Sequence, residues 1–446
     1  MNAADRVTGA DEFARLLEPV IVVGAGIAGL VVARDLALAG VAVTVLEASD
    51  RVGGQLAAAT VAGVEVDAAA ESFATRDRSV ADLLEEIGLG EQIVAPLDAP
   101  AWLVRGPRDA LPLPAASILG IPATPYASDV TAAIGWGGSF RAQLDSFIPL
   151  LRPDRYRTVG ELVRARMGSR VLDRLVAPVV RGVHSTTPDA LPLDVAAPGL
   201  RAALARTGSL HAAVTELRAA SPAGSQVNGV AGGMHRIAEA LRTRAEVMGA
   251  VIRLNTRVVA VDELGVVTAD GERLAGRVVV AAPGVASRPA RQRRITVAIA
   301  AVDAPGLDAH PRGTGALVVA GAEGIVARAF THSNAKWAWL GEGLPPHRHL
   351  VRLSYDEAPA DVASTVLADL RAITGAEIGG LADVVTRTWT RTLESEPVAP
   401  GIDVVGEAGS ASGLARIVTA ARPIAARLAG ADLNGSDDPG NGEVKE

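Results

Sequence analysis

The feature that most constrains the fold is the segment VIVVGAGIAGLVVARDLALAGVAVTVLEASDRVGG at residues 20–54. Its apolar start, residues 20–23, is typical of a buried parallel strand. Gly24, Gly26 and Gly29 follow in the G-x-G-x-x-G spacing. These glycines allow, in turn, a tight turn, a close approach of the backbone to a pyrophosphate, and a helix packed closely on the strand.

The rest of this segment completes a nucleotide-binding unit. We expect a helix over residues 27–39, ended by Gly40, and a second strand over residues 42–46. The strand leads to Glu47, where an acid accepts hydrogen bonds from ribose hydroxyls. A lone glycine pattern also fits a turn without a ligand. Strand, glycines, helix, strand and acid in this order predict a dinucleotide site.

Composition and charge exclude several classes of function. The chain has 446 residues, enough for two or three domains, and a net charge of −7, which disfavours nucleic-acid binding. It has no cysteine, and His347 and His349 follow two prolines, so we expect a solvated loop there and no metal site. The charged residues 1–18 do not fit a signal peptide, and prolines interrupt the weakly charged residues 110–140. We therefore expect a cytoplasmic protein without a membrane span.

Strand–turn–helix patterns recur in three separate parts of the chain. Residues 18–90, 225–290 and 400–430 share them, with two long inserts between. A simple nicotinamide dehydrogenase rarely needs such an interruption, whereas a long, buried FAD touches several distant segments.

Two glycine-rich segments favour FAD over NAD. Arg51 precedes Gly53 and Gly54 and can reach the phosphates, while the two glycines let the backbone pass under the flavin side of the cofactor. The alternative is a surface arginine and an ordinary turn. Near the C-terminus, GEAGSASGL forms a second strand-to-helix turn, and its helix start at Gly413 and Leu414 could face the electron-rich end of the flavin.

We therefore expect an α/β fold with α+β inserts. The expected parts are a Rossmann-like FAD-binding domain assembled from residues 1–90, 225–290 and 400–430, a helical insert at 91–220, a mixed-sheet substrate-binding domain at 291–399 and a disordered tail at 431–446.

The motifs as a whole resemble a known family. The chain is similar to the flavin-containing amine oxidase superfamily and, within it, to the protoporphyrinogen/coproporphyrinogen oxidases of haem biosynthesis. The similarity rests on VVGAGIAGL, VLEASDRVGGQ, VDAAAESFATR, WLVRGPRDALPLPAASILGIP, LVAPVVRGVHSTTPDALPLDVAAPGL, GVAGGMHRIAEAL, THSNAKW and GEAGSASGLARIVTAAR, in family order along almost the whole chain.

This resemblance implies an FAD-dependent oxidase. It would convert coproporphyrinogen III or protoporphyrinogen IX to the porphyrin by successive hydride transfers to the flavin, with oxygen as acceptor. The flavin carries the chemistry, so no protein side chain is assigned a catalytic role. The expected FAD-binding residues are Gly24, Gly26, Ile27, Ala28, Gly29, Glu47, Ala48, Arg51, Gly53, Gly54, Gln55, Ser72, Val258, Ala282, Gly406, Glu407, Gly413 and Leu414.

Two residues are candidates for contact with the substrate. The guanidinium of Arg76 suits a propionate, and its alternative is a surface position. Lys336 has a place near flavin or substrate, or else in a solvated loop. Residues 110–140 either touch a membrane surface, as in membrane-bound relatives, or pack as a buried loop. We interpret the basic run of Arg288, Arg291, Arg293 and Arg294 as a solvated connector.

Two other functions stay open. The first keeps FAD but acts on an amine or as a desaturase. The second is a flavin-fold relative that has lost catalysis and binds a tetrapyrrole or a partner. It is motivated by departures from the family pattern: no aromatic residue follows Trp389, and the last turn reads Gly406-Glu407-Ala408 where the family commonly has Gly-Asp-Trp.

Overall fold

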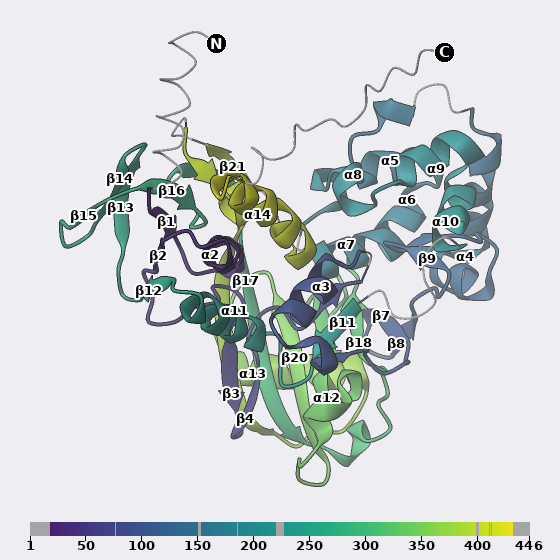
Figure 1. The fold of residues 1–446 in the computed structure, drawn as a ribbon. Helices are drawn as coiled ribbons and strands as arrows, with labels where there is room; N and C mark the ends of the chain where they lie inside the picture. The colour runs from purple at the N-terminus through teal and green to yellow at the C-terminus, as the bar shows by residue number, and fades with distance from the viewer. Residues whose placement is uncertain are drawn as a thin grey trace, which may run out of the picture.

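The structure contains two large β-sheets and a separate group of helices (Figure 1). Figure 1 also shows that helix α14, near the end of the chain, lies beside helix α2, near its beginning. The computed structural model describes residues 18–75, 77–149, 153–184, 186–219, 227–397, 401–409, 411 and 413–430.

The first sheet has five strands, and all of its pairings are parallel. The strand that precedes the glycine turn is central and fully covered, which explains its uninterrupted apolar sequence. The strands of this sheet come from three separate segments of the chain, residues 20–46, 251–280 and 403–404, so the sheet forms only when these segments meet. In order across the sheet the strands are β12 (Val251–Arg253), β2 (Val43–Leu46), β1 (Val20–Val23), β16 (Arg277–Val280) and β22 (Asp403–Val404).

Both faces of this sheet are covered. One face shares a core with four helices, and the other packs against a small antiparallel sheet through residues such as Val258 and Val266. The helices are α2 (Ile27–Leu38), α3 (Ser79–Glu86), α11 (Arg236–Val247) and α14 (Leu414–Leu428), and the small sheet is β13 (Val258–Asp262), β14 (Gly265–Thr268) and β15 (Arg273–Ala275).

The second large sheet has seven strands and is mixed, because β18 pairs with β7 in parallel while its other pairings are antiparallel. Residues 101–112, assigned to the helical insert from the sequence, contain its last two strands, β7 and the edge strand β8. Its order is β21 (Leu381–Pro397), β17 (Ser287–Asp303), β20 (Arg348–Tyr355), β19 (Ala329–His332), β18 (Gly315–Val318), β7 (Ala101–Gly106) and β8 (Asp109–Pro112).

Strand β17 corrects one interpretation of the sequence. Arg288, Arg291, Arg293 and Arg294 lie in this strand, not in a solvated connector. Exposed and covered residues alternate over 287–294, and the strand then becomes buried on both faces. Polar residues on both faces hid the strand pattern in the sequence.

Short elements connect and cover the two sheets. Helix α13 packs on one face of the seven-stranded sheet, and the β3–β4 hairpin packs on the other. These elements are α13 (Val362–Thr374), β3 (Ala58–Val61), β4 (Val64–Asp67), β5 (Phe73–Ala74), η1 (Gly90–Gln92), β6 (Ile93–Val94), β11 (Val227–Val230), η6 (Pro305–Leu307), α12 (Ser333–Lys336), η7 (Ala338–Gly341) and η8 (Gly406–Gly409).

The helical insert has a core of its own, built from short helices. Within the described part of the chain, no helix is both long and apolar enough to cross a membrane. The elements of the insert are β9 (Ser117–Ile118), β10 (Ile121–Pro122), α4 (Ser128–Gln143), η2 (Leu144–Phe147), η3 (Pro153–Arg155), α5 (Val159–Arg166), α6 (Ser169–Val171), η4 (Leu172–Val176), α7 (Ala177–His184), η5 (Pro188–Ala190), α8 (Leu193–Ala196), α9 (Leu200–Thr207) and α10 (Leu210–Ala219).

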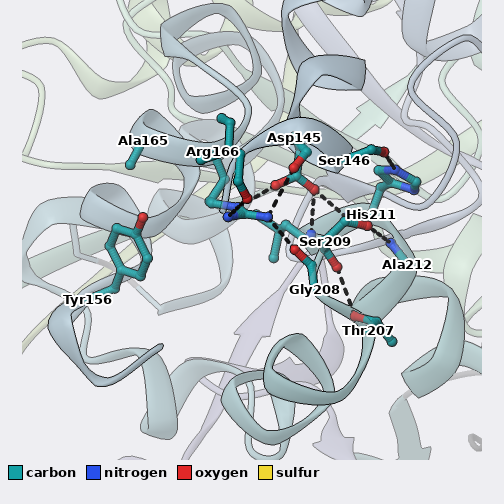
Figure 2. Close-up of polar contacts among 12 residues, drawn as sticks. Asp145, Ser146, Tyr156, Ala165, Arg166, Thr207, Gly208, Ser209, His211 and Ala212 are labelled. Atoms are coloured by element: carbon teal, nitrogen blue, oxygen red, sulfur yellow. Dashed lines mark hydrogen bonds and ion pairs between the residues drawn. The ribbon is translucent and has the colours of Figure 1, made fainter. Parts of the chain in front are cut away.

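A buried ion pair joins three parts of the insert (Figure 2). Arg166 and Asp145 are both 0% exposed, and Arg166 Nε donates to Asp145 Oδ1. Arg166 Nη1 donates to the carbonyl oxygen of Ile148 at 2.9 Å, and Nη2 donates to that of Gly208 at 2.6 Å. Asp145 Oδ2 accepts from the backbone of Leu210. The charges are balanced, and the pair fixes α5 to η2 and to the start of α10.

Candidate active site

The glycine turn after β1 has the geometry that its spacing predicts. Gly24 has φ +99°, and a Cβ atom there would lie 3.1 Å from the Cβ of Ala282. A Cβ on Gly29 would come 2.0 Å from the carbonyl oxygen of Gly24, so α2 can sit this close only with glycine. A Cβ on Gly26 would meet no described residue within 4 Å. Protein packing thus requires two of the glycines, and the third leaves open space at the start of α2, the kind of position at which a helix N-terminus offers N–H groups to a phosphate.

Glu47 lies at the carboxyl end of β2, directly beside this turn. Its Oε2 accepts from the backbone N–H of Ala25 at 2.7 Å. Its Oε1 accepts from the backbone N–H and the hydroxyl of Ser49, at 2.9 and 2.7 Å. A carboxylate offers about four lone-pair sites, so one remains after these three bonds. The carboxylate is thus held in place and can still accept a hydrogen bond from a ribose.

The second glycine pair lies against the first turn. Gly53 donates its N–H to the carbonyl oxygen of Ala25 at 2.8 Å and forms an isolated parallel bridge with Gly26. A Cβ on Gly54 would lie 3.4 Å from the Cα of Gly26. Both residues of the pair have positive φ, +100° and +57°, which glycine adopts without strain. The two segments quoted from the sequence therefore form one surface.

Arg51 belongs to the same surface, but its guanidinium faces its own segment. Nη1 donates to the carbonyl oxygen of Val52 at 3.2 Å, and Nη2 donates to that of Gly54 at 2.9 Å. A guanidinium has five N–H donors, so others remain for a phosphate. The phosphate contact of Arg51 stays a prediction.

The C-terminal glycine turn reaches the same place from the other end of the chain. Gly406 has φ +65°, and a Cβ there would lie 2.7 Å from the Cβ of Ala28 in the first turn of α2. Gly413, with φ +85°, is the N-cap of α14, and Leu414 is the first residue of that helix. The two glycine turns, separated by about the whole length of the chain, are therefore in contact.

Glu407, in this turn, faces strand β21. Its Oε2 accepts from the backbone N–H of Thr392 at 3.1 Å, and its Oε1 lies 3.8 Å from Arg391 Nε. A predicted FAD-binding residue thus joins the turn to the seven-stranded sheet.

The remaining predicted cofactor residues differ in position and burial, and their contacts with FAD stay predictions. Ile27 and Ala28, the first two residues of α2, are buried in the core. Ala48 is exposed next to Glu47, while Gln55 and Ser72 are half-buried. Val258 is buried at the start of β13, and Ala282 follows β16 and donates its N–H to Val23 at 3.0 Å.

Of the two residues predicted to contact the substrate, the structure describes only Lys336. Arg76 lies outside the described residues. Lys336 is not in a solvated loop, since it ends α12 and its Nζ is 2.6 Å from Glu71 Oε1. Arg352 completes this group: Nη1 donates to Glu71 Oε2 at 2.9 Å, and Nη2 donates to the carbonyl oxygen of Ala69 at 2.6 Å. Burial opposes ionisation, but the two cations lower the pKa of Glu71 to about 2.

His347 and His349 also differ from expectation. His349 is buried in β20, where its Nδ1 is 3.0 Å from His332 Nε2 and its Nε2 is 3.0 Å from Asp308 Oδ1. Only His347 is exposed, and its Nδ1 is 2.6 Å from Asp308 Oδ2. The alternation in HLVRLSY was the available signal for a strand here.

Comparison with known proteins identifies the family. The family model for flavin containing amine oxidoreductase matches residues 27–309. The chain is 31% identical to coproporphyrinogen III oxidase of Mycobacterium leprae over 78% of this chain and 79% of that protein. It is also 31% identical to coproporphyrinogen III oxidase of Mycobacterium tuberculosis H37Rv, over 86% of this chain and 88% of that protein.

The chain belongs to the flavin containing amine oxidoreductase family. It is therefore an FAD-dependent oxidoreductase, as the sequence predicts.

Solved structures confirm the predicted mixed α/β fold. "Putative protoporphyrinogen oxidase" from Exiguobacterium sp. 255-15 has a TM-score of 0.76 and 22% identity, covering 92% of this chain and 98% of that one. Cyclohexylamine oxidase from Brevibacterium oxydans IH-35A has a TM-score of 0.60 and 16% identity, covering 94% and 100%. The TM-scores show that the fold is shared, and at identities this low the likeness gives no information about the substrate.

The residues present fit FAD. Open space at Gly26 meets the N-terminus of α2, Glu47 is oriented beside it, and the two glycine turns are in contact. This arrangement offers N–H groups to a pyrophosphate and a carboxylate to a ribose.

Proposed function

We propose that this enzyme oxidises a porphyrinogen, coproporphyrinogen III or protoporphyrinogen IX, to the porphyrin in haem biosynthesis, with oxygen as the electron acceptor. The observation that carries the proposal is the similarity to coproporphyrinogen III oxidases over 86% of the chain. When bound, FAD supplies the acceptor for the hydride that leaves a bridging carbon of the substrate.

The protein positions the cofactor in this scheme. Glu47 holds the ribose, the N-terminus of α2 at Gly26 and the Arg51 segment hold the pyrophosphate, and the N-terminus of α14 faces the flavin ring. The contact between Gly406 and Ala28 supports this, because it brings the two helix starts to one place.

The first experiment is anaerobic mixing with coproporphyrinogen III. We expect the flavin absorbance to bleach and porphyrin fluorescence to appear, with renewed turnover when oxygen is admitted. Oxidation of an amine without porphyrin formation would support an amine oxidase instead. A flavin that porphyrinogen never reduces would support a binding protein without catalysis. The motivation for that alternative is the short stretch without aromatic residues between Trp389 in β21 and the start of β22.

A variant of Glu47 tests the cofactor site separately. Glu47→Ala removes the acceptor for the ribose and should weaken FAD retention by about tenfold or more. Asp50→Ala, an exposed acid three residues away, is the matched control and should retain FAD. Equal FAD affinity in both variants, or NADPH bound in its place, would contradict the assignment.

We also propose a cytoplasmic location with peripheral membrane contact through the insert. Trp136 and Phe140, one helical turn apart in α4, are 73% and 59% exposed, and Phe147 is 78% exposed. The Tyr126 ring lies 6.2 Å from that of Trp136. Exposed aromatic side chains such as Tyr126, Trp136 and Phe140 suit a lipid–water interface. Sedimentation with anionic vesicles should fall in a Trp136→Ser/Phe140→Ser variant, whereas equal sedimentation would contradict the contact.

A further inference from the structure

Four arginines from four separate segments gather where the helical insert meets the seven-stranded sheet. We call the group the arginine cluster: Arg181 of α7, Arg293 of β17, Arg328 before β19 and Arg391 of β21, with the carboxylates Asp356 and Glu407.

Asp356, just after β20, lies at the centre of this group. Arg293 Nη2 donates to Asp356 Oδ1, and Arg181 Nη2 donates to Asp356 Oδ2 at 3.2 Å. Arg328 Nη1 lies 3.5 Å from Asp356 Oδ1. One carboxylate therefore serves three guanidinium groups, while Glu407 is the nearest carboxylate to the fourth, Arg391.

The cluster carries more positive than negative charge. Among the described residues, its four guanidinium groups face two carboxylates, Asp356 and Glu407. Arg293 and Arg391 are direct partners on adjacent antiparallel strands. Like charges in that position destabilise a sheet. Burial, followed by the charges of Arg293, Arg181 and Arg391, lowers the pKa of Arg328 to about 10, with Asp356 acting in the opposite direction.

The charge is also poorly exposed to water. The side chain of Arg328 is 7% exposed and that of Arg391 is 20% exposed. Nε of Arg391 is buried and makes no hydrogen bond to the described residues, because its 3.8 Å distance from Glu407 is too long for one. A buried donor without an acceptor is costly, so this arrangement is suited to a ligand that supplies one.

The position of the cluster connects it to the cofactor site. Glu407 belongs to η8, which begins at Gly406, and Gly406 contacts Ala28 at the start of α2. Arg391 is therefore next to the turn that carries the proposed flavin contacts. We infer that the arginine cluster binds a pair of neighbouring carboxylates of the substrate beside the flavin. This inference rests on the proposed function and adds the substrate contact that it lacks.

A guanidinium group has the geometry that this ligand needs. Its planar fork matches a carboxylate through two parallel hydrogen bonds. Two carboxylates would balance the two excess positive charges of the cluster. Both candidate porphyrinogens carry two neighbouring propionates, whereas a simple amine substrate carries none.

The test compares Arg391→Gln and Arg181→Gln with Arg288→Gln. Arg288 lies on β17, is 74% exposed and pairs with Glu396, so it is a matched control outside the cluster. Arg181, at 30% exposure, provides a second variant with little risk to folding. We expect KM for coproporphyrinogen III to rise about tenfold in both cluster variants, with kcat and FAD content nearly unchanged, and no change in Arg288→Gln.

Binding without turnover separates this inference from the proposed function. Wild type should bind coproporphyrin III more tightly than its tetramethyl ester, and Arg391→Gln should lose that preference. If wild type oxidises no porphyrinogen but shows this Arg391-dependent preference, the proposed function fails and the cluster site stands. If both cluster variants bind coproporphyrin III as wild type does, the inference is wrong. It is also wrong if Arg391→Gln loses FAD, because the cluster would then hold the cofactor.

Discussion

Arginine side chains are charge-balanced in the helical insert but carry excess positive charge in the arginine cluster. Arg166 is fully buried, faces one carboxylate, and each of its three nitrogens donates a hydrogen bond to Asp145, Ile148 or Gly208 (Figure 2). In the cluster, four guanidinium groups share two carboxylates, and Arg391 Nε has no acceptor among the described residues. The charges of the Arg166–Asp145 pair are balanced within the protein, whereas the excess positive charge of the cluster is the charge that the inferred substrate carboxylates would balance.

The group around Glu71 lies between these two extremes. One carboxylate, 15% exposed, faces the two cations Lys336 and Arg352, so a single positive charge is in excess. It also joins distant segments, because Glu71 precedes β5 while Lys336 and Arg352 belong to the seven-stranded sheet and its adjoining helix. Among the described residues, the excess of positive charge therefore increases from the Arg166 pair through the Glu71 group to the arginine cluster.

The largest expected effect is the loss of Asp145. Asp145→Ala leaves the charge of Arg166 buried without its carboxylate, which should lower the free energy of unfolding by about 3–5 kcal/mol. Urea unfolding followed by circular dichroism measures it. The control is Asp194→Ala. Asp194 is 67% exposed and pairs with Arg201, so its loss should cost less than about 1 kcal/mol. If both variants lost a similar free energy of unfolding, the buried pair would be no more important for stability than an exposed one.

Glu71→Gln should have the next largest effect, and it should depend on pH. The folded pKa of Glu71, about 2, lies below its ordinary value of 4.5, so its ion pairs stabilise the fold above pH 4.5. That contribution is lost as the pH falls towards 2. At pH 7 the variant should lose on the order of 3 kcal/mol, and the difference from wild type should shrink on acidification.

An exposed acid provides the control for this pH dependence. Glu85 is 58% exposed and pairs with Arg78, so Glu85→Gln should change stability little at any pH. A Glu71→Gln effect that stays constant with pH would show that the loss comes from packing and not from ionisation.

The sequence predicted local features well, because they depend on neighbouring residues. The strand before the glycine turn spans Val20–Val23 as expected, α2 ends one residue earlier than expected, and α14 begins at Leu414. Each of these features is set by a short apolar run, a glycine or a helix start within a few positions.

The arginine cluster could not be predicted, because its members come from distant parts of the chain. Arg293 and Arg391 are neighbours only through the pairing of β17 with β21, and Arg181 joins them from the helical insert. The basic run in β17 shows its strand alternation only in the structure, where Arg288 and Arg294 are exposed and Arg291 and Arg293 are partly covered.

Buried polar groups were missed for the same reason. His332 and His349 meet only when β19 and β20 pair, and burial, followed by the neighbouring His349 and His310, lowers the pKa of His332 to about 3. The run HLVRLSY indicates a strand at His349, but it does not indicate that His332 of a separate strand would lie beside it.

The smallest expected effect is that of Arg391→Gln. It is the most informative for the comparison, because this variant should gain stability whereas the others should lose it. Arg391→Gln removes a positive charge that directly faces Arg293 across the strands, so the free energy of unfolding should rise by up to about 1 kcal/mol. Arg387→Gln, an exposed position on the same strand opposite Val297, is the control and should change stability by less. Urea unfolding at low and high salt measures both, and salt should reduce the gain by screening the repulsion. A loss as large as that of Asp145→Ala would mean that Arg391 supports the fold as Arg166 does, and the cluster would then be a structural network without need of a ligand.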